Sequence, residues 1–410
     1  MFKKSLAAVA VLGAFAATSF AVDVTLYGKV DMGVKYQNEE VTGFDGVEKT
    51  TDSFTLDSGV GSGSRIGLKA TEDLGNGYKV SFKLEKGFKV DGTPEGSDRF
   101  FDRESSLSLS SGWGTVMAGR FGSFSAAASA TDIVMSRVDS FDGGHTGAEL
   151  VMLGKMDNAI AYLSPKVAGF QAAAMYSFKN DNTAKEGKIA EYDDAWNNVE
   201  GVIGNEEGHH TADHYAGLAL TYDIGALQTA LSYEQVIRQS GGVVYQENSN
   251  DPASFVTGQQ PDDDARIVTF GGNYDFDLFK LYAAGQYFEG MTDVIGFEDA
   301  DYTPDLDAKG IKGYGLHVGT NFDALGGHFG AAVYYVDAEA DLDGAQDADG
   351  QYFGVAGRYV YDLSKRTNIR TTLAYNQQTW DKVGKFDAKT NNSDFEQNTY
   401  VAKVSLTHNF

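Results

Sequence analysis

An alternation of apolar and polar residues with a period of two runs through the whole chain and constrains its fold more than any other feature. Near the start, in "VDVTLYGKVDMGVKYQ", every second residue from Val24 to Tyr36 is apolar or glycine, and the residues between are mostly polar. The last segment, "NTYVAKVSLTHNF", repeats the pattern from Tyr400 to Phe410. Successive side chains of a β-strand point to opposite faces, whereas an α-helix repeats every 3.6 residues. The pattern therefore predicts long amphipathic strands.

The same alternation predicts sixteen strands along the chain. Besides the first, which starts at about residue 22, they are expected near residues 65–70, 78–85, 103–111, 115–123, 158–165, 170–178, 214–224, 227–236, 265–277, 279–290, 312–323, 328–339, 351–363, 367–379 and 398–410.

The connections between these strands alternate in length. Short ones such as "GNG", "GWG", "LGG" and "SKR" interleave with polar ones of roughly ten to forty residues. Membrane barrels sort their connections in this way, with short periplasmic turns and long outer loops. A sheet in lipid must also close on itself, because no water is present to satisfy an open edge. These features predict an all-β, 16-stranded antiparallel transmembrane β-barrel with a polar, water-filled lumen; the alternative is a soluble secreted β-protein.

Composition and the first residues agree with export. Lys3 and Lys4 precede the apolar run "LAAVAVLGAFAA" and the small-residue stop "SFA", which predicts a secretory signal peptide at residues 1–21 and a barrel domain at residues 22–410. No later stretch is long and apolar enough for a membrane helix. The chain has no cysteine, and its net charge of -25 argues against nucleic acid as a partner.

Several segments resemble the Gram-negative general diffusion porins, in particular the proteobacterial type that opens "VTLYG". They are "VTLYGKVDMGVKY", "SRIGLKATEDLGNGYKVSFKLEKGF", "RESSLSLSSGWGTVMAGR", "DNAIAYLSPKVAGF", "YDLSKRTNIRTTLAYN" and the terminal "VSLTHNF". The resemblance spans essentially the whole chain after the signal peptide. It implies a trimeric barrel whose third long loop, here about residues 124–157, folds inward and narrows the pore. It also implies that the terminal Phe410 is read by the outer-membrane assembly machinery.

The resemblance further implies a basic wall that faces an acidic inner loop at the constriction. Residues on the polar faces of their strands supply candidates for the wall, and Arg358, Arg370 and Lys79 share that face. Strict alternation would turn Arg103 toward the apolar face, so its direction stays open. We expect a basic wall of Arg65, Lys69, Lys83, Arg103 and Arg120, and an acidic loop face of Asp132, Asp139, Asp142 and Glu149.

The predicted function is passive diffusion of ions and small hydrophilic solutes across the outer membrane of a Gram-negative bacterium. Charged groups on opposite sides of a narrow polar gap orient dipolar solutes and give weak charge selectivity. The sign is open, because lumen bases favour anions and the acidic loops favour cations; the acidic loops tilt the expectation slightly toward cations. Expected partners are two further copies of the chain, outer-membrane lipid and lipopolysaccharide, and the assembly machinery; no cofactor or metal is expected.

Other functions remain as alternatives. The long acidic loops at residues 179–213 and 237–264 would suit an adhesin or surface antigen, and a substrate-specific porin is a closer variant. His209, His210 and His214 could bind a divalent cation but are expected to be solvated loop residues. No set of nucleophile, base and orienting acid stands out, so an enzyme is not predicted.

Overall fold

The computed structural model describes residues 24–43, 46–93, 99–141, 150–178, 188–192, 198–202, 213–238, 243–247, 255–259, 264–291, 310–340, 348–381 and 394–410. The predicted signal peptide, Asp142, Glu149, His209 and His210 lie outside these residues.

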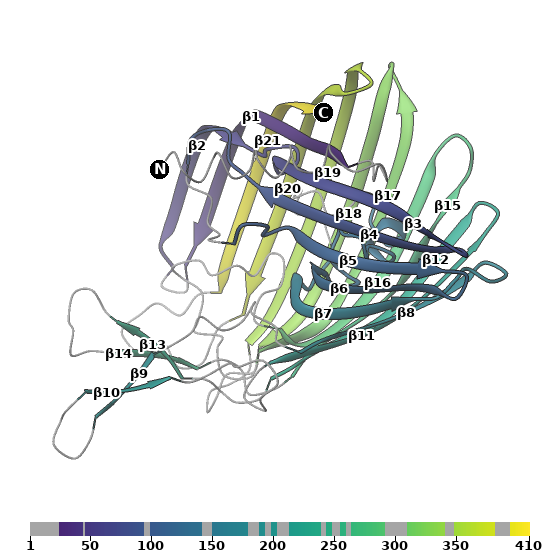
Figure 1. The fold of residues 1–410 in the computed structure, drawn as a ribbon. Coiled ribbons are helices and arrows are strands. Elements are labelled where there is room, and N and C mark those ends of the chain that lie inside the picture. The colour runs from purple at the N-terminus through teal and green to yellow at the C-terminus, as the bar shows by residue number, and fades with distance from the viewer. Residues whose placement is uncertain are drawn as a thin grey trace.

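The chain forms an antiparallel barrel that closes on itself (Figure 1). The main sheet has 17 strands, but β2 and β3 pair with successive parts of the same edge of β1 and so share one position, which makes the barrel sixteen-stranded. The described elements are β1 Thr25–Thr42, β2 Glu48–Ser58, β3 Arg65–Gly75, β4 Tyr78–Gly87, β5 Glu104–Ser111, β6 Gly114–Gly122, α2 Met135–Val138, β7 Lys155–Leu163, β8 Phe170–Ser177, β9 Lys188–Tyr192, β10 Asn198–Val202, β11 His214–Ile224, β12 Leu227–Ile237, β13 Val243–Glu247, β14 Phe255–Gln259, β15 Ala265–Asp275, β16 Lys280–Met291, β17 Ile311–Ala324, β18 Gly327–Ala340, β19 Ala348–Ser364, β20 Thr367–Trp380 and β21 Phe395–Asn409.

The first and last strands seal the barrel. β1 pairs with β21 from Lys29 opposite Asn409 to Thr42 opposite Glu396. Beyond the last ladder pair, the Gly28 and Phe410 backbones exchange two hydrogen bonds of 3.1 and 3.0 Å. A side chain at Gly28 would collide with the Phe410 ring, since a Cβ there would lie 2.3 Å from its Cζ. The terminal segment therefore closes the sheet onto the first strand, which leaves no open edge at the seam.

Side chains alternate between the lumen and the outer face as the sequence predicted. On β12, Leu231 and Tyr233 are 44% and 40% exposed, while Ser232 and Glu234 between them are buried. On β17, the exposed Leu316 and Val318 flank the buried His317. Because the exposed residues are apolar and the residues between them are buried and polar, the outer face of these strands suits acyl chains.

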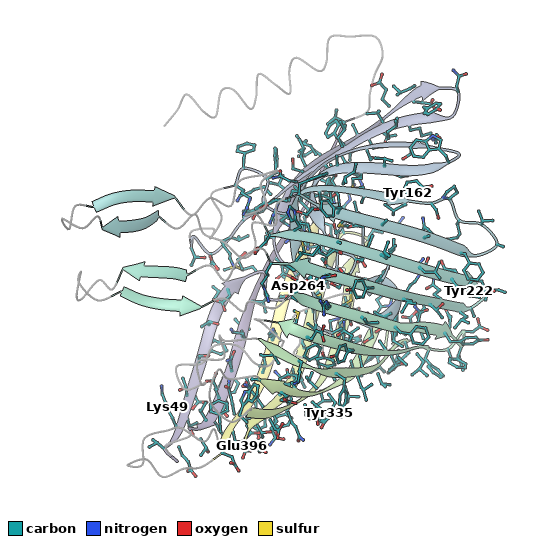
Figure 2. The ribbon with its side chains drawn as sticks, turned by 90° about the horizontal axis from the view of Figure 1, so that it is seen from below. Lys49, Tyr162, Tyr222, Asp264, Tyr335 and Glu396 are labelled. Atoms are coloured by element: carbon teal, nitrogen blue, oxygen red, sulfur yellow. The ribbon has the colours of Figure 1, made fainter. Side chains whose placement is uncertain are left out.

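Aromatic side chains gather near the strand ends that carry short turns. Tyr162 stacks on Trp113 with ring centroids 6.3 Å apart, and Tyr222 stacks on Phe170 at 4.3 Å. Figure 2 shows Tyr162 and Tyr222 near these ends of their strands. Such rings are typical of the level where a barrel meets the lipid headgroups.

The sixteen expected strands are confirmed, and the described residues add five more: β2 in the barrel, and the pairs β9–β10 and β13–β14, which form two-stranded sheets of their own. β2 is an extra segment that alternation did not reveal, and the glycine-rich break at residues 59–64 separates it from β3. α2 is a single short turn. Among the described residues, no helix has the length and hydrophobicity to span a bilayer.

Candidate functional site: the lumen constriction

The described parts of the connection between β6 and β7, residues 123–141 and 150–154, fold into the barrel and pack against one side of its wall. α2 lies within this connection and contacts β12, β15 and β16. Phe124, Val134, Met135, Val138 and Leu150 of the connection have no exposed surface. They belong to one buried cluster with wall residues of β11, β15, β16 and β18, namely Tyr215, Ile267, Phe288 and Tyr334. We call these described parts, residues 123–141 and 150–154, the inner loop.

Two wall side chains fasten the two ends of the inner loop. The buried Glu234 carboxylate on β12 accepts hydrogen bonds from the Tyr215 hydroxyl (2.7 Å) and the Ser125 amide (3.2 Å). The Gln286 side-chain amide on β16 accepts from the Val151 N–H (2.8 Å) and donates to the Val151 carbonyl (2.9 Å). Buried backbone groups of a loop need such partners where no strand supplies them.

Further side chains hold the middle of the loop. Asn273 on β15 donates to the Arg137 carbonyl at 2.8 Å, and the Arg137 guanidinium donates to both Asp223 oxygens at 2.9 and 2.8 Å. Asn321 on β17 donates to the Ser140 carbonyl at 2.9 Å. The inner loop therefore fills the side of the lumen next to β11–β17, and the open passage lies toward β1, β3, β19 and β20.

On that opposite side, the break at residues 59–64 bends toward the lumen. The Gly61 N–H donates to the buried Asp31 carboxylate on β1 at 2.9 Å, and the Asp31 N–H donates to the Ser64 hydroxyl at 3.0 Å. A Cβ at Gly61 would lie 2.3 Å from the Ser405 Oγ and 3.0 Å from the Arg370 Cδ. Only glycine allows this close approach of the backbone to β20 and β21.

Between the break and the inner loop lies a cavity of about 540 Å³. The break at residues 59–64 orients three of the basic side chains that line this cavity. Arg370 donates to the Gly61 carbonyl (3.2 Å), Arg65 to the Gly63 carbonyl (3.1 Å), and Lys29 to the Ser62 hydroxyl (3.0 Å). Six basic side chains line the cavity, and we call them the basic cluster: Lys29, Arg65, Arg103, Lys155, Arg358 and Arg370.

Arg103 turns toward the lumen because β5 begins only at Glu104, so strand alternation does not govern its direction. Its Nε donates to Glu85 at 2.7 Å, and the Arg65 Nη1 lies 3.9 Å from the same carboxylate. Glu85 therefore binds the cluster directly, whereas Asp31 binds the break that holds Arg370.

The inner loop presents an apolar surface to the same cavity. Phe141, Met152, Leu153 and residues 126–128, which are all alanine, line it, and no Asp or Glu is among the described lining residues. The Arg358 guanidinium carbon lies 4.9 Å from the centre of the Phe141 ring, a cation–π contact that joins the two sides. The passage therefore has one basic side and one apolar side.

The two described acids expected to face the wall have other contacts. Asp132 accepts the N–H groups of Ala128 and Ser136 within the loop, both at 2.9 Å. The Asp139 side chain is buried, accepts the Phe141 N–H at 2.8 Å, and lies 3.9 Å from His317 on the wall. Both carboxylates shape the loop and neither lines the cavity. Asp142 and Glu149 lie outside the described residues.

Of the bases expected on the wall, Arg65 and Arg103 lie in the cluster and three do not. Arg120 pairs with Asp157 at 2.6 Å, and Lys83 pairs with Glu104 at 2.8 Å. The Lys69 amine lies over the Tyr27 ring, 5.2 Å from its centre. Lys69 and Lys83 line a neighbouring hollow that Ala130 also borders, so they extend the basic side without entering the main cavity.

Sequence reasoning named Arg358 and Arg370 only by their strand face and did not include Lys29 or Lys155. Lys29 sits on the polar face of the first strand, and that signal was available. Lys155 is the first residue of β7. The glycine-rich run "GVGSGS" at residues 59–64 indicates the break that gathers the cluster, but it was not used in the prediction. Among the described residues, no three metal-ligating side chains come together.

A family model described as Gram-negative porin matches residues 7–380. The chain belongs to the Gram-negative porin family. It is 31% identical over 409 residues to an outer membrane porin protein of Bordetella pertussis, covering 91% of this chain and 94% of that one. Among solved structures, the anion-selective porin from Comamonas acidovorans has a TM-score of 0.60 at 22% identity, covering 95% and 100% of the two chains. OmpT of Vibrio cholerae in its trimer form has a TM-score of 0.52 at 14% identity, covering 94% and 99%.

The porin is an outer-membrane barrel that forms a channel for passive diffusion, and its family is one of channels and not of enzymes. The two low-identity structures bear on the fold alone. Their match over nearly the full chain agrees with the closed barrel.

Proposed function

We propose that this porin is a general diffusion channel that favours anions. The observation that supports the proposal is the basic cluster, in which Lys29, Arg65, Arg103 and Arg370 converge on one cavity whose described lining residues include no Asp or Glu. Fixed charges around a narrow polar gap raise the local concentration of the oppositely charged ion without a tight binding step.

This sign differs from the slight expectation of cations, and the reason is the orientation of the inner loop. The acids of the loop were expected to offset the basic wall. Asp132 and Asp139 instead satisfy backbone groups of the loop, and alanine, phenylalanine, methionine and leucine side chains face the bases. The name of the Comamonas acidovorans structure, an anion-selective porin of the same fold, agrees with the proposed sign.

The test is the reversal potential of the purified, folded porin in a planar bilayer under a KCl gradient. We expect discrete conductance steps, a conductance that rises linearly with dilute KCl, and a reversal potential on the side of the chloride equilibrium potential. A reversal potential on the potassium side would contradict the proposed sign. Pure folded protein that gives no conductance steps would refute a channel altogether.

We also propose that the porin works as a homotrimer in contact with lipopolysaccharide and reaches the outer membrane through the assembly machinery, with Phe410 as its recognised end. The trimer form of OmpT of Vibrio cholerae supports the homotrimer. The pairing of Phe410 with Gly28 at the seam of the barrel supports the role of Phe410 in assembly. Chemical cross-linking of outer membranes, read by the mass of the product, tests the oligomeric state: a species of three chains is expected, and monomer alone would refute it.

A further inference from the structure

The cavity at the constriction has two chemically unlike sides. One is the basic cluster, and its Arg65, Arg103 and Arg370 are held by Gly63, Glu85 and Gly61. The other is the inner-loop surface of Met152, Leu153, Phe141 and residues 126–128, which we call the apolar shelf. A simple hydrated ion gains from the first side only.

The apolar shelf is a firm surface and not a mobile flap. Phe141 and Leu153 are 2% and 8% exposed, and the Leu153 N–H donates to the Ser125 hydroxyl at 2.9 Å. Ser125 is in turn fixed to Glu234 on the barrel wall. A solute that passes the basic cluster therefore passes a fixed apolar surface across a cavity of about 540 Å³.

A solute that meets both sides at once carries an anionic head and an apolar body. Carboxylate oxygens match guanidinium groups in charge and geometry, since an arginine can donate two parallel hydrogen bonds to one carboxylate. An alkyl chain or ring on the same molecule removes apolar area from water when it lies along Met152, Ala127 and Ala128, the accessible residues of the shelf. Pockets that bind small molecules commonly combine a few placed polar groups with an apolar lining.

We propose that the constriction is a binding site for small organic anions with an apolar part, such as monocarboxylates of medium chain length, and passes them in preference to hydrophilic anions of the same charge. The proposal rests on the proposed anion preference of the channel and adds a substrate class to it. Chloride, which cannot use the apolar shelf, passes without saturation, whereas the organic anions bind and so obstruct the chloride current.

The expected size of the effect follows from the area available. Full burial of a CH₂ group strengthens binding about fourfold, and contact along one side about twofold. Hexanoate carries four more CH₂ groups than acetate, so we expect it to half-block the chloride current at a concentration on the order of tenfold lower. In a pore with hydrophilic walls only, the larger anion would gain nothing.

The experiment measures chloride current through the folded porin in planar bilayers while acetate, butyrate or hexanoate is added to one side. The half-blocking concentration should fall with each lengthening of the chain. 1-Hexanol at the same concentrations serves as the neutral control, and it should not block because it lacks the anionic head. Saturable block by hexanoate but not by hexanol is the expected result.

Substitutions on the apolar shelf test whether the dependence of block on chain length arises there. In Met152→Ser the ratio of the acetate to hexanoate half-blocking concentrations should fall by about twofold to fourfold, and Met152→Leu should restore it. Val167→Ser, an exposed apolar position in the turn before β8, should leave the ratio as it is. Ala127→Ser, a smaller change on the same shelf, provides a second reading if Met152→Ser does not fold.

The outcomes separate the two proposals. A wild-type reversal potential without anion preference would overturn the proposed function. Anion preference combined with equal half-blocking concentrations for acetate and hexanoate would overturn only the apolar shelf. A chain-length dependence that persists unchanged in both Met152→Ser and Ala127→Ser would also overturn it, because the binding surface would then lie elsewhere.

Discussion

Replacement of Arg370 by glutamine tests whether the basic cluster sets the ion preference. Arg370 lies on β20, lines the cavity, and donates to the Gly61 carbonyl at 3.2 Å. Glutamine keeps a polar side chain that can donate to the same carbonyl but removes one positive charge. The chloride preference should fall and not vanish, because Lys29, Arg65 and Arg103 remain.

The size of the loss follows from the cavity. Its volume of about 540 Å³ corresponds to a sphere of about 5 Å radius, and at that distance two unit charges interact by about 0.8 kcal/mol in water. Screening at 0.1 M salt lowers this to about 0.5 kcal/mol. The change acts with opposite sign on chloride and potassium, so the ratio of their permeabilities should fall about fivefold.

The assay is the reversal potential in a KCl gradient, compared with two matched variants. Arg366→Gln changes an exposed arginine in the turn between β19 and β20 and should leave the ratio unaltered. Arg120→Gln should shift it less than Arg370→Gln does, because Arg120 does not line the cavity and is paired at 2.6 Å with Asp157, which Arg99 also binds at 2.7 Å. An Arg370→Gln channel that matches Arg366→Gln, or that becomes more anion-selective, would refute the placement of the cluster at the selective point.

Two further predictions concern the inner loop and the seam of the barrel. Gln286→Leu removes both hydrogen bonds to Val151 and leaves buried backbone groups unsatisfied, at a cost of about 1 to 3 kcal/mol each. We expect a noisier open-channel current and loss of the folded band in electrophoresis at a lower temperature. Gln351→Leu, at an exposed position, is the control. Equal noise and equal thermal stability in the two variants would show that Gln286 does not anchor the loop. Deletion of Phe410 removes two backbone hydrogen bonds and the ring packed on Gly28, so the amount of folded porin in the outer membrane should fall steeply while the surviving channels keep their conductance. A normal amount of folded porin would contradict that role, and Phe410→Tyr should retain most of it.

The barrel could be predicted from sequence because its determinants are local. In a strand that separates lipid from water, the polarity of each side chain shows which face it lies on. The fifteen connections alternate between short and long, which indicates that consecutive strands pair with one another. β2 escaped because the break at residues 59–64 interrupts its continuation into β3, and because most residues from Glu48 to Ser53 are polar on both faces.

The site was harder, because strand face gives direction but not distance. Arg120 and Arg370 both lie on the polar face of their strands, yet one pairs with Asp157 and the other lines the cavity. Which of them meets the passing ion depends on the level of each strand in the barrel and on how the inner loop packs. The alternation of apolar and polar residues gives neither the level of a strand in the barrel nor the packing of the inner loop. For Arg103 the direction itself could not be predicted, because it depends on the residue at which β5 begins.

Under the proposed anion preference, the net charge of the whole chain is a poor guide to the passage, because charge acts locally in salt. The Debye length is about 8 to 10 Å under physiological conditions, so a charge farther than this from the constriction contributes little there. Several described acids are also paired: Asp223 binds Arg137, Asp157 binds Arg120, and Glu104 binds Lys83. What an ion meets in the cavity is decided by the few side chains that line it, and there the break at residues 59–64 gathers arginine and lysine from strands distant in the sequence. A chain with a net charge of -25 can therefore present a positive passage.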